Sequence, residues 1–499
     1  MPITLIQFFH WYYPSDHSLW RHLQEEIPNL KAKGITGVWL PPAYKGASGG
    51  YSVGYDSYDL FDLGEFDQKG TIPTKYGNRN EYLEAVKACK KAGLQVLADV
   101  VFNHKAGADE LERFTVKKVN PVNRTEFISD NFDIEAWTKF TFPGRNGKYS
   151  QFVWDHQCFT GIDWAHDLNE GGVYTIQNQY GEGWEDLVEE ELGNYDYLMN
   201  ADIEFRNPSV REELKYWGKW YLETTKVSGF RLDAVKHMSP DFIKEWVEYM
   251  QTLSKKPLLF IGEYWNIHDV EALLRYIEAT GRHVQLFDAP LHHNFFVASK
   301  MGNKYDLRTI FDNSLLQKMP DRAITIVDNH DTQPLQDLES PVEAWFKPIA
   351  HALILLRQDG IPCVFYPSLY DAHYVDKGGD GNDYEIWLSR VPELDVMLPI
   401  RAQLATGEQI DYFDHPNCVG WVRKGQRGKP ETGVAVLISN GSDGFKYMEL
   451  GASHAGQEYC DILHRDKPPL TLNEKGGADF SCPAGGVSVW ISCQMAQNF

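Results

Sequence analysis

Three short apolar runs of this sequence each end in a carboxylic acid, namely Asp233, Glu263 and Asp331. Short apolar runs between turn residues are typical of buried parallel strands. Barrels built from such strands carry their chemistry at the strands' carboxyl ends, so we expect the three acids to meet in one pocket. Acids held in different protonation states are what cleavage of a glycosidic bond requires.

The residues beside each acid suggest different tasks. Arg231 lies two positions before Asp233 and shares its face of the strand. A nearby guanidinium favours the ionised carboxylate that a nucleophile needs, although a structural ion pair has the same pattern. Glu263 ends a run with no other charge, which suits a proton-carrying acid, although a helix-capping acid is equally compatible. Asp331 ends the polar segment 328–331, which is costly to bury without a function.

The elements that must position these acids alternate between helix and strand. Gly34, Gly93 and Gly360 each stand between a helical pattern and an apolar run, as expected after a helix end. Eight candidate strands lie near residues 4–10, 36–40, 95–101, 229–233, 258–263, 283–287, 323–327 and 363–366. Alternating strands and helices predict a parallel sheet, and eight strands predict an α/β fold closed as a (β/α)8 TIM barrel.

Two other segments depart from this alternation. Residues 104–206 are rich in Gly, Asn, Asp and aromatics with little helical period, which predicts an inserted domain after the third strand. From residue 408 to 499 short β-like runs alternate with turns, which predicts an antiparallel β-sandwich. We therefore expect the catalytic barrel to comprise residues 1–103 and 207–407.

Composition narrows the classes of partner. The 499 residues carry a formal net charge of -22, which makes nucleic acid and anionic membranes poor partners. The seven cysteines are widely spaced and odd in number, which predicts free thiols in a reducing compartment. The first residues lack the pattern of a signal peptide, so we expect a cytoplasmic protein, with a secreted mature form as the alternative. We expect a monomer, although no residue pattern bears on oligomeric state.

Four segments together resemble the signature regions of the α-amylase family. They are Asp99-Val100-Val101-Phe102-Asn103-His104, Gly229-Phe230-Arg231-Leu232-Asp233-Ala234-Val235-Lys236-His237, Gly262-Glu263 and Val327-Asp328-Asn329-His330-Asp331. The similarity extends over nearly the whole chain and is greatest to bacterial liquefying-type α-amylases, including cytoplasmic ones. It implies a retaining endo-hydrolase of α-1,4-glucosidic bonds in starch, glycogen or maltodextrins.

The resemblance also implies roles for single residues. Asp233 would be the nucleophile, Glu263 the acid and base, and Asp331 the group that stabilises the transition state. The substrate would be held by Arg231, His104, His330, Tyr55, Lys236 and His237. Of these, Lys236 and His237 would lie on the reducing-end side of the cleaved bond.

A structural calcium ion is implied by the same resemblance. Its ligands would be Asn103, Asp196, Asp202 and the backbone carbonyl of His237, all hard oxygen donors that calcium prefers. The sequence departs from the family pattern nearby: Glu204 stands where many relatives have Asp, and Thr160 and Glu185 stand where relatives with several metals have Asp. We therefore expect one calcium ion and doubt further cations.

Other functions remain open at this point. An exo-acting, maltooligosaccharide-forming amylase or a transglycosylase would use the same three acids. A barrel kept only for binding or transport would usually lack one of them, and all three are present here. A metal-dependent sugar isomerase would place acids and histidines around a metal at the reacting sugar, whereas the expected ligands here lie beside the three acids.

Overall fold

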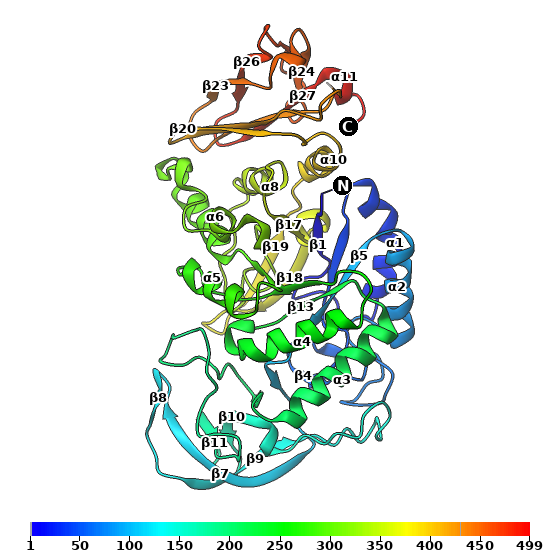
Figure 1. Cartoon of the computed structure of the whole chain (residues 1–499), viewed down its shortest axis with the longest axis vertical. Helices are drawn as coiled ribbons and strands as arrows, with labels where there is room; N and C mark the ends of the chain where they lie inside the picture. Colours follow the sequence, from blue (N-terminus) through cyan, green and yellow to red (C-terminus); the bar gives the residue numbers. More distant parts are fainter. Residues whose placement is uncertain (1, 430) are drawn as a thin grey trace.

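The predicted barrel is present in the computed structural model, which describes residues 2–429 and 431–499. Eight parallel strands close on themselves in the order β1-β17-β16-β15-β14-β13-β5-β2 (Figure 1). Their bounds are Leu5–Gln7 (β1), Gly37–Leu40 (β2), Gln95–Val100 (β5), Gly229–Leu232 (β13), Leu259–Gly262 (β14), Gln285–Phe287 (β15), Ala323–Thr325 (β16) and Ile361–Phe365 (β17). Each lies within or overlaps one of the eight predicted runs, so the expected TIM barrel is confirmed.

Helices cover the outside of the barrel. The longer ones are α1 (Leu19–Ala32), α2 (Arg79–Lys91), α3 (Pro208–Thr225), α4 (Pro240–Thr252), α5 (Val270–Ala279), α6 (Ala289–Met301), α8 (Lys347–Leu355) and α10 (Leu394–Gln403). Gly34 follows α1 with φ +81°, the left-handed conformation that glycine adopts without strain. Within the described residues, we find no helix that is long and apolar enough to cross a membrane.

The start and the buried face of helix α3 follow from its amino-acid sequence. The Asn207 side chain accepts a hydrogen bond from Ser209 N, and Pro208 occupies the first turn, where a missing N–H costs nothing. Val210, Leu214 and Trp217 lie on one face and are fully buried. Ser239 stands in the same position before α4 but makes no side-chain capping bond.

The segment after β5 forms its own antiparallel sheet at one end of the molecule (Figure 1). Its strands run in the order β6-β12-β10-β11-β7-β8, with β9 paired to β7. Their bounds are His104–Lys105 (β6), Glu110–Asn120 (β7), Asn123–Phe127 (β8), Phe132–Lys139 (β9), Phe159–Ala165 (β10), Glu170–Ile176 (β11) and Ala201–Ile203 (β12). Strands β6 and β12 pair with each other, so the two ends of the segment meet where it leaves the barrel. We keep 104–206 as the proposed extent of the inserted domain.

Antiparallel sheets form the opposite end of the molecule, as expected (Figure 1). One sheet has the order β20-β21-β22-β27-β24-β25, and a second joins β23 to β26. Their bounds are Gln409–His415 (β20), Cys418–Arg423 (β21), Val434–Ser439 (β22), Gly444–Glu449 (β23), Glu458–Asp461 (β24), Leu470–Thr471 (β25), Gly477–Cys482 (β26) and Val487–Ser492 (β27). The start of this domain at residue 408 stays a proposal.

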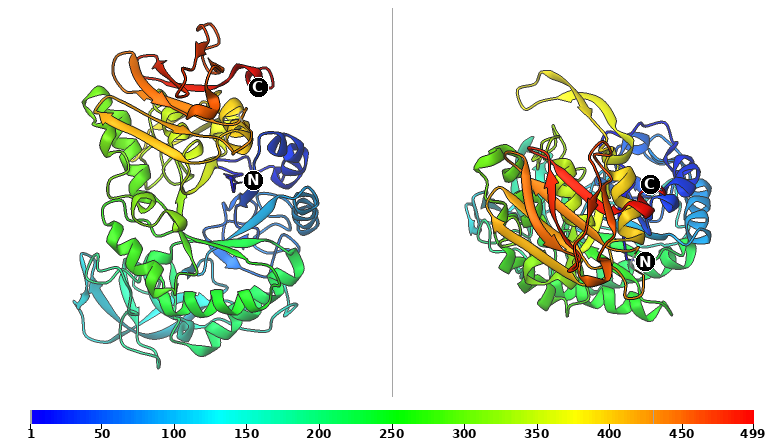
Figure 2. Two further views of the ribbon diagram at one scale, coloured as in Figure 1. Left: turned by 45° about the horizontal axis from the view of Figure 1, so that its top comes forward. Right: turned by 90° about the horizontal axis from the view of Figure 1, so that it is seen from above.

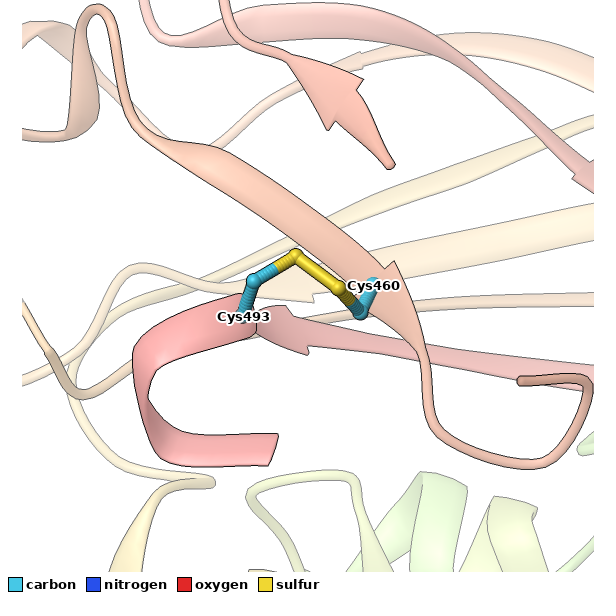
Figure 3. Close-up of a disulfide and its surroundings, with 2 residues drawn as sticks. All are labelled: Cys460 and Cys493. Carbon is cyan, nitrogen blue, oxygen red and sulfur yellow. A yellow bond between two sulfur atoms is a disulfide. The ribbon is translucent and has the colours of Figure 1, made fainter. Parts of the chain in front are cut away.

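The prediction that every cysteine is free is wrong. Cys460 on β24 and Cys493, directly after β27, form a disulfide (Figure 3). The other five cysteines are free and buried. The pair joins residues 33 positions apart, and sequence spacing alone gave no sign that the fold brings them together.

One further element was not predicted. After β17 and the short helix α9 (Pro367–Tyr370), strands β18 (Ala372–Lys377) and β19 (Asp383–Leu388) form an antiparallel hairpin. It projects from the body of the molecule as a yellow ribbon (Figure 2, right). The segment has strand-like alternation, but it lies in a stretch that we had assigned wholly to the barrel.

Candidate active site

Two of the three acids leave the barrel side by side. Strands β13 and β14 are neighbours and pair Leu232 with Gly262, so Asp233 and Glu263 follow at the same level. Asp331 follows β16 and lies close enough to both for their charges to interact. The structure therefore brings the three acids together at the carboxyl end of the barrel, where the sequence placed them.

Arg231 connects the acids. Its Nη1 donates to Asp233 Oδ1 (2.5 Å) and to Asp99 Oδ1 (2.9 Å). Its Nη2 forms an ion pair with Glu263 Oε2 at 2.8 Å. One fully buried guanidinium thus holds the two candidate reacting carboxylates at its two terminal nitrogens. The expectation that Glu263 lies in apolar surroundings is incomplete, because it contacts Arg231 and accepts a bond from Ala234 N (3.1 Å).

Asp99 belongs to this site, although we did not predict it as a site residue from the sequence. It lies opposite Arg231 in the register of β5 and β13. Trp39 Nε1 (3.0 Å) and Tyr55 Oη (2.8 Å) donate to its Oδ2, while Arg231 binds its other oxygen. The signal for it was an acid at the end of an apolar run, the same signal that marked Asp233. Its contacts fix the position of Arg231, and Arg231 in turn fixes Asp233.

These acids compete for few positive charges. Burial raises the pKa of Asp233 well above its usual range, Arg231 opposes this rise, and the charges of Glu263 and Asp99 add to it. The pKa of Asp331 is raised well above its usual range, chiefly by burial and then by the charge of Glu263. Burial likewise raises the pKa of Asp99, which Arg231 counteracts. One guanidinium cannot neutralise four carboxylates, so simultaneous ionisation of the whole group is disfavoured.

Aromatic rings surround this acid group. Tyr55 and His330 stack with ring centroids 4.9 Å apart, and Trp11 stacks on Tyr55 at 5.8 Å. His330 Nδ1 is buried without a hydrogen-bond partner. Burial and the charge of Arg231 lower the pKa of His330 well below its usual value, so its imidazole is neutral. A neutral imidazole with a free nitrogen is suited to bind a hydroxyl group.

The remaining predicted substrate ligands lie at the edges of the site. His104 Nε2 is 2.8 Å from the carbonyl of Tyr55, which ties it to the same group. Lys236 forms an ion pair with Glu191 at 2.6 Å, and His237 Nδ1 is 2.6 Å from the carbonyl of Tyr195. Burial lowers the pKa of His237 to about 3. Lys236 and His237 thus contact residues 189–195 of the inserted segment rather than the acids.

The predicted calcium ligands form a second acidic group beside the barrel. Asn103 Nδ2 donates to Asp202 Oδ1 (3.1 Å), whose other oxygen accepts from Thr160 Oγ1. Asp196 accepts from the backbone N of Glu185 (3.1 Å). Burial raises the pKa of Asp196 to about 7, and the pKa of Asp202 is raised well above its usual range by burial and by the charge of Asp196.

The donors of this group fit a hard cation in some respects. Asn103 Oδ1 is buried and accepts no hydrogen bond, and the nearby Arg206 is engaged with Glu204 (2.6 Å). Oxygen donors with excess negative charge are what calcium prefers. In the described part of the chain, however, no three His, Cys, Asp or Glu side chains gather into a metal site by themselves. The predicted set would depend on the amide of Asn103 and the carbonyl of His237.

Comparisons with known proteins identify a matching family and similar chains. The sequence model of the family "Alpha amylase, catalytic domain" matches residues 19–368. The chain is 52% identical to a cytoplasmic alpha-amylase of Escherichia coli K12 over 98% of both chains. It is 46% identical to an alpha-amylase of Geobacillus stearothermophilus, covering 98% of this chain and 86% of that one.

Two further similarities bear on activity and fold. The chain is 43% identical to a glucan 1,4-alpha-maltohexaosidase of Bacillus sp. strain 707, covering 98% of this chain and 92% of that one. A solved alpha-amylase of Geobacillus thermoleovorans, complexed with acarbose, matches with TM-score 0.63 at 18% identity, covering 98% and 97% of the two chains. At that identity the structural match bears on the fold alone.

Proposed function

The chain belongs to the α-amylase family, and from this premise we propose how its residues cleave the substrate. It is a glycoside hydrolase of α-1,4-glucan bonds, as are its relatives at 42–52% identity over nearly the full chain. The observation that carries the mechanism is the position of Asp233 and Glu263 on one guanidinium. The assignment of individual roles below is the proposal.

In the first step, a carboxylate oxygen of Asp233 attacks the anomeric carbon while Glu263 gives its proton to the glycosidic oxygen. The bond to the leaving glucan breaks, and a glycosyl ester with Asp233 forms. Arg231 supports this division because its charge opposes the rise that burial causes in the pKa of Asp233. The other role falls to Glu263, which lies against the second terminal nitrogen of the same guanidinium and which we assign as the proton donor.

In the second step, Glu263 takes a proton from water, and the resulting nucleophile attacks the anomeric carbon. The ester to Asp233 breaks, Glu263 is again protonated, and the product keeps its α configuration. Asp331 lies beside this centre and stabilises the positive charge that develops on the sugar ring in both transition states. The neutral imidazoles of His104 and His330 bind ring hydroxyls, and Tyr55 provides a stacking face.

We propose endo-action on starch, glycogen or maltodextrins. The relative named as a maltohexaosidase supports an exo-acting alternative on the same acids. Chromatography of the early products from soluble starch distinguishes the two readings, with Glu263→Gln as the inactive control. A mixture of medium-length α-configured oligosaccharides supports endo-action, whereas one short product supports exo-action.

A calcium ion would be held by Asn103, Asp196, Asp202 and the carbonyl of His237. When bound, it would supply positive charge to buried acids and join the inserted segment to the barrel. Support comes from the unpartnered Asn103 Oδ1 and from the charge of Asp196, which raises the pKa of the neighbouring Asp202. No step of the reaction runs through this ion.

We propose a cytoplasmic location on the strength of the Escherichia coli relative's name. The Cys460–Cys493 disulfide argues in the other direction, because disulfides are rare in reducing compartments. Thiol titration of the protein isolated from its own cells, under alkylating conditions, decides the matter. Five reactive thiols after denaturation would place it in an oxidising compartment, and seven in a reducing one.

A further inference from the structure

The β18–β19 hairpin is joined to the active-site loops by aromatic and polar contacts. Tyr374 on β18 stacks on Tyr12 with ring centroids 3.9 Å apart. Tyr12 Oη donates to Asp376 Oδ2 (2.6 Å), and Tyr374 Oη donates to the carbonyl of Pro334 (2.9 Å) in the loop that carries Asp331. Tyr12 directly follows Trp11, the ring that stacks on Tyr55. Two consecutive residues therefore contact the ring beside the acids and the hairpin, respectively.

The two faces of the hairpin differ. Register pairs Asp376 with Tyr384 and Tyr374 with Ile386, so these four share the face that contacts Tyr12. His373 and Trp387 are paired on the opposite face, where their rings stack at 3.8 Å and Trp387 is 69% exposed. We call these the inner and outer faces of the hairpin.

The aromatic ring of Tyr384, on the inner face, is held in place by its neighbours. Its ring lies against Gly378, where a Cβ atom would come within 2.7 Å of Tyr384 Cε2. Its hydroxyl donates to Asp380 Oδ2 (2.9 Å), which also accepts from Asn382 Nδ2 (2.7 Å). The ring is nevertheless 44% exposed, so it keeps a face for a ligand. A fixed, half-exposed ring with carboxylates beside it matches a sugar, which has an apolar face and a rim of hydroxyls.

Barrel order indicates which part of the substrate reaches this face. The hairpin follows β17, and Lys236 and His237 follow β13. Strands β17 and β13 lie four positions apart in the closed barrel of eight, on opposite sides of its mouth. If Lys236 and His237 lie on the reducing-end side of the cleaved bond, as the family resemblance implies, the hairpin lies on the non-reducing side.

We propose that the inner face of the β18–β19 hairpin is an outer glucose-binding subsite for the non-reducing part of the α-glucan, with Tyr384 as its stacking ring. The hairpin lies beyond residue 368, where the match to the family's catalytic domain ends. The inference rests on the proposed function, since it needs the glucan to lie across Asp233 and Glu263. In this proposal the hairpin distinguishes substrates by the number of their glucose units and has no part in the cleavage of the bond.

The test is kcat/KM for the series from maltotriose to maltooctaose, measured with the full-length wild type and Tyr384→Ala. We expect equal values for the short members and a roughly three- to tenfold loss once the substrate is long enough to reach the hairpin. Gly378→Ala, which displaces the ring, reproduces the loss, whereas Tyr384→Phe retains most of the wild-type value. Maltooctaose labelled at its reducing end gives longer labelled fragments with Tyr384→Ala, because fewer glucose units are held on the non-reducing side.

The matched control is Trp387→Ala, which removes a more exposed aromatic ring from the outer face of the same hairpin. We expect it to leave every substrate length unchanged. The proposal is overturned if Tyr384→Ala has no effect, if it affects all lengths equally, or if Trp387→Ala produces the same length-dependent loss. A wild type that hydrolyses none of the series would instead refute the proposed function.

Discussion

Two groups of buried acids lie near each other in this molecule, and they differ in how their negative charge is compensated. At the barrel mouth, Asp99, Asp233 and Glu263 all contact Arg231, which lies inside the group. At the base of the inserted segment, burial raises the pKa of both Asp196 and Asp202, and the charge of Asp196 raises that of Asp202 further. The nearby Arg206 forms an ion pair with Glu204.

The difference teaches what each group can do. A built-in guanidinium with more acids than it can neutralise leaves protons to be exchanged, which suits catalysis. Acids without their own cation repel each other until an external cation binds, which suits stabilisation. Changes in the first group should therefore alter turnover, and changes in the second should alter stability.

The largest expected effect is on turnover in the first group. Glu263→Gln and Asp233→Asn should each lower kcat by roughly three orders of magnitude or more, because each removes a group that bonds to or protonates the substrate. Reducing-sugar release measures the loss, and thermal unfolding within a few degrees of wild type shows that the fold is intact. Robust residual hydrolysis by either variant would contradict the assignment.

Replacing Arg231 by Lys should lower kcat roughly 10²-fold, because an ammonium group cannot hold Asp233 and Glu263 at two nitrogens. Loss of the guanidinium also raises the pKa of Asp233, so the acidic limb of the kcat/KM profile should move to higher pH. The matched control is Arg206→Lys in the second group, which should leave kcat and the pH profile unchanged. Equal effects of the two substitutions would show that the two acid groups do not differ in function.

Calcium removal should act on stability alone. Chelation should lower the melting temperature by roughly 5–10 °C, equivalent to about 2–4 kcal/mol of unfolding free energy, while initial turnover at 25 °C is maintained. Asp202→Asn should show the lower melting temperature without a chelator and respond little when one is added. If chelation stopped turnover at once in a protein with an unchanged melting temperature, the ion would belong to the first group.

The smallest effect should come from Tyr55→Phe. The substitution keeps the stacking ring but removes the hydroxyl that donates to Asp99 Oδ2 at 2.8 Å. One such bond to a charged acceptor contributes about 1.5–3 kcal/mol, of which a part reaches Asp233 through Arg231, so kcat/KM should fall roughly three- to tenfold. A steady-state comparison on one short oligosaccharide suffices, and a fall as large as that of Arg231→Lys would mean that Tyr55 acts directly on the substrate.

Much of the barrel could be predicted because its signals are local. Each strand is a short apolar run, and helix ends carry glycine or a capping residue, as at Gly34 and Asn207. The hairpin at 372–388 was missed because its two strands are short and lie in a stretch that we had assigned wholly to the barrel. The disulfide was missed because the pairing depends on β24 and β27 being neighbours in the folded sheet, which the spacing of cysteines along the sequence does not indicate.

By itself the sequence predicted the barrel, the antiparallel sheets beyond it, and the positions of Asp233, Glu263 and Asp331 after barrel strands, since strand ends are marked by residue type. Only the tertiary structure decided that Arg231 contacts three acids at once, that Asp99 completes the group, and that Tyr384 shares a face with Asp376 near Tyr12. The reason is physical: composition and periodicity fix which residues are buried, but the distances and charges between residues remote in the chain exist only after the chain has folded.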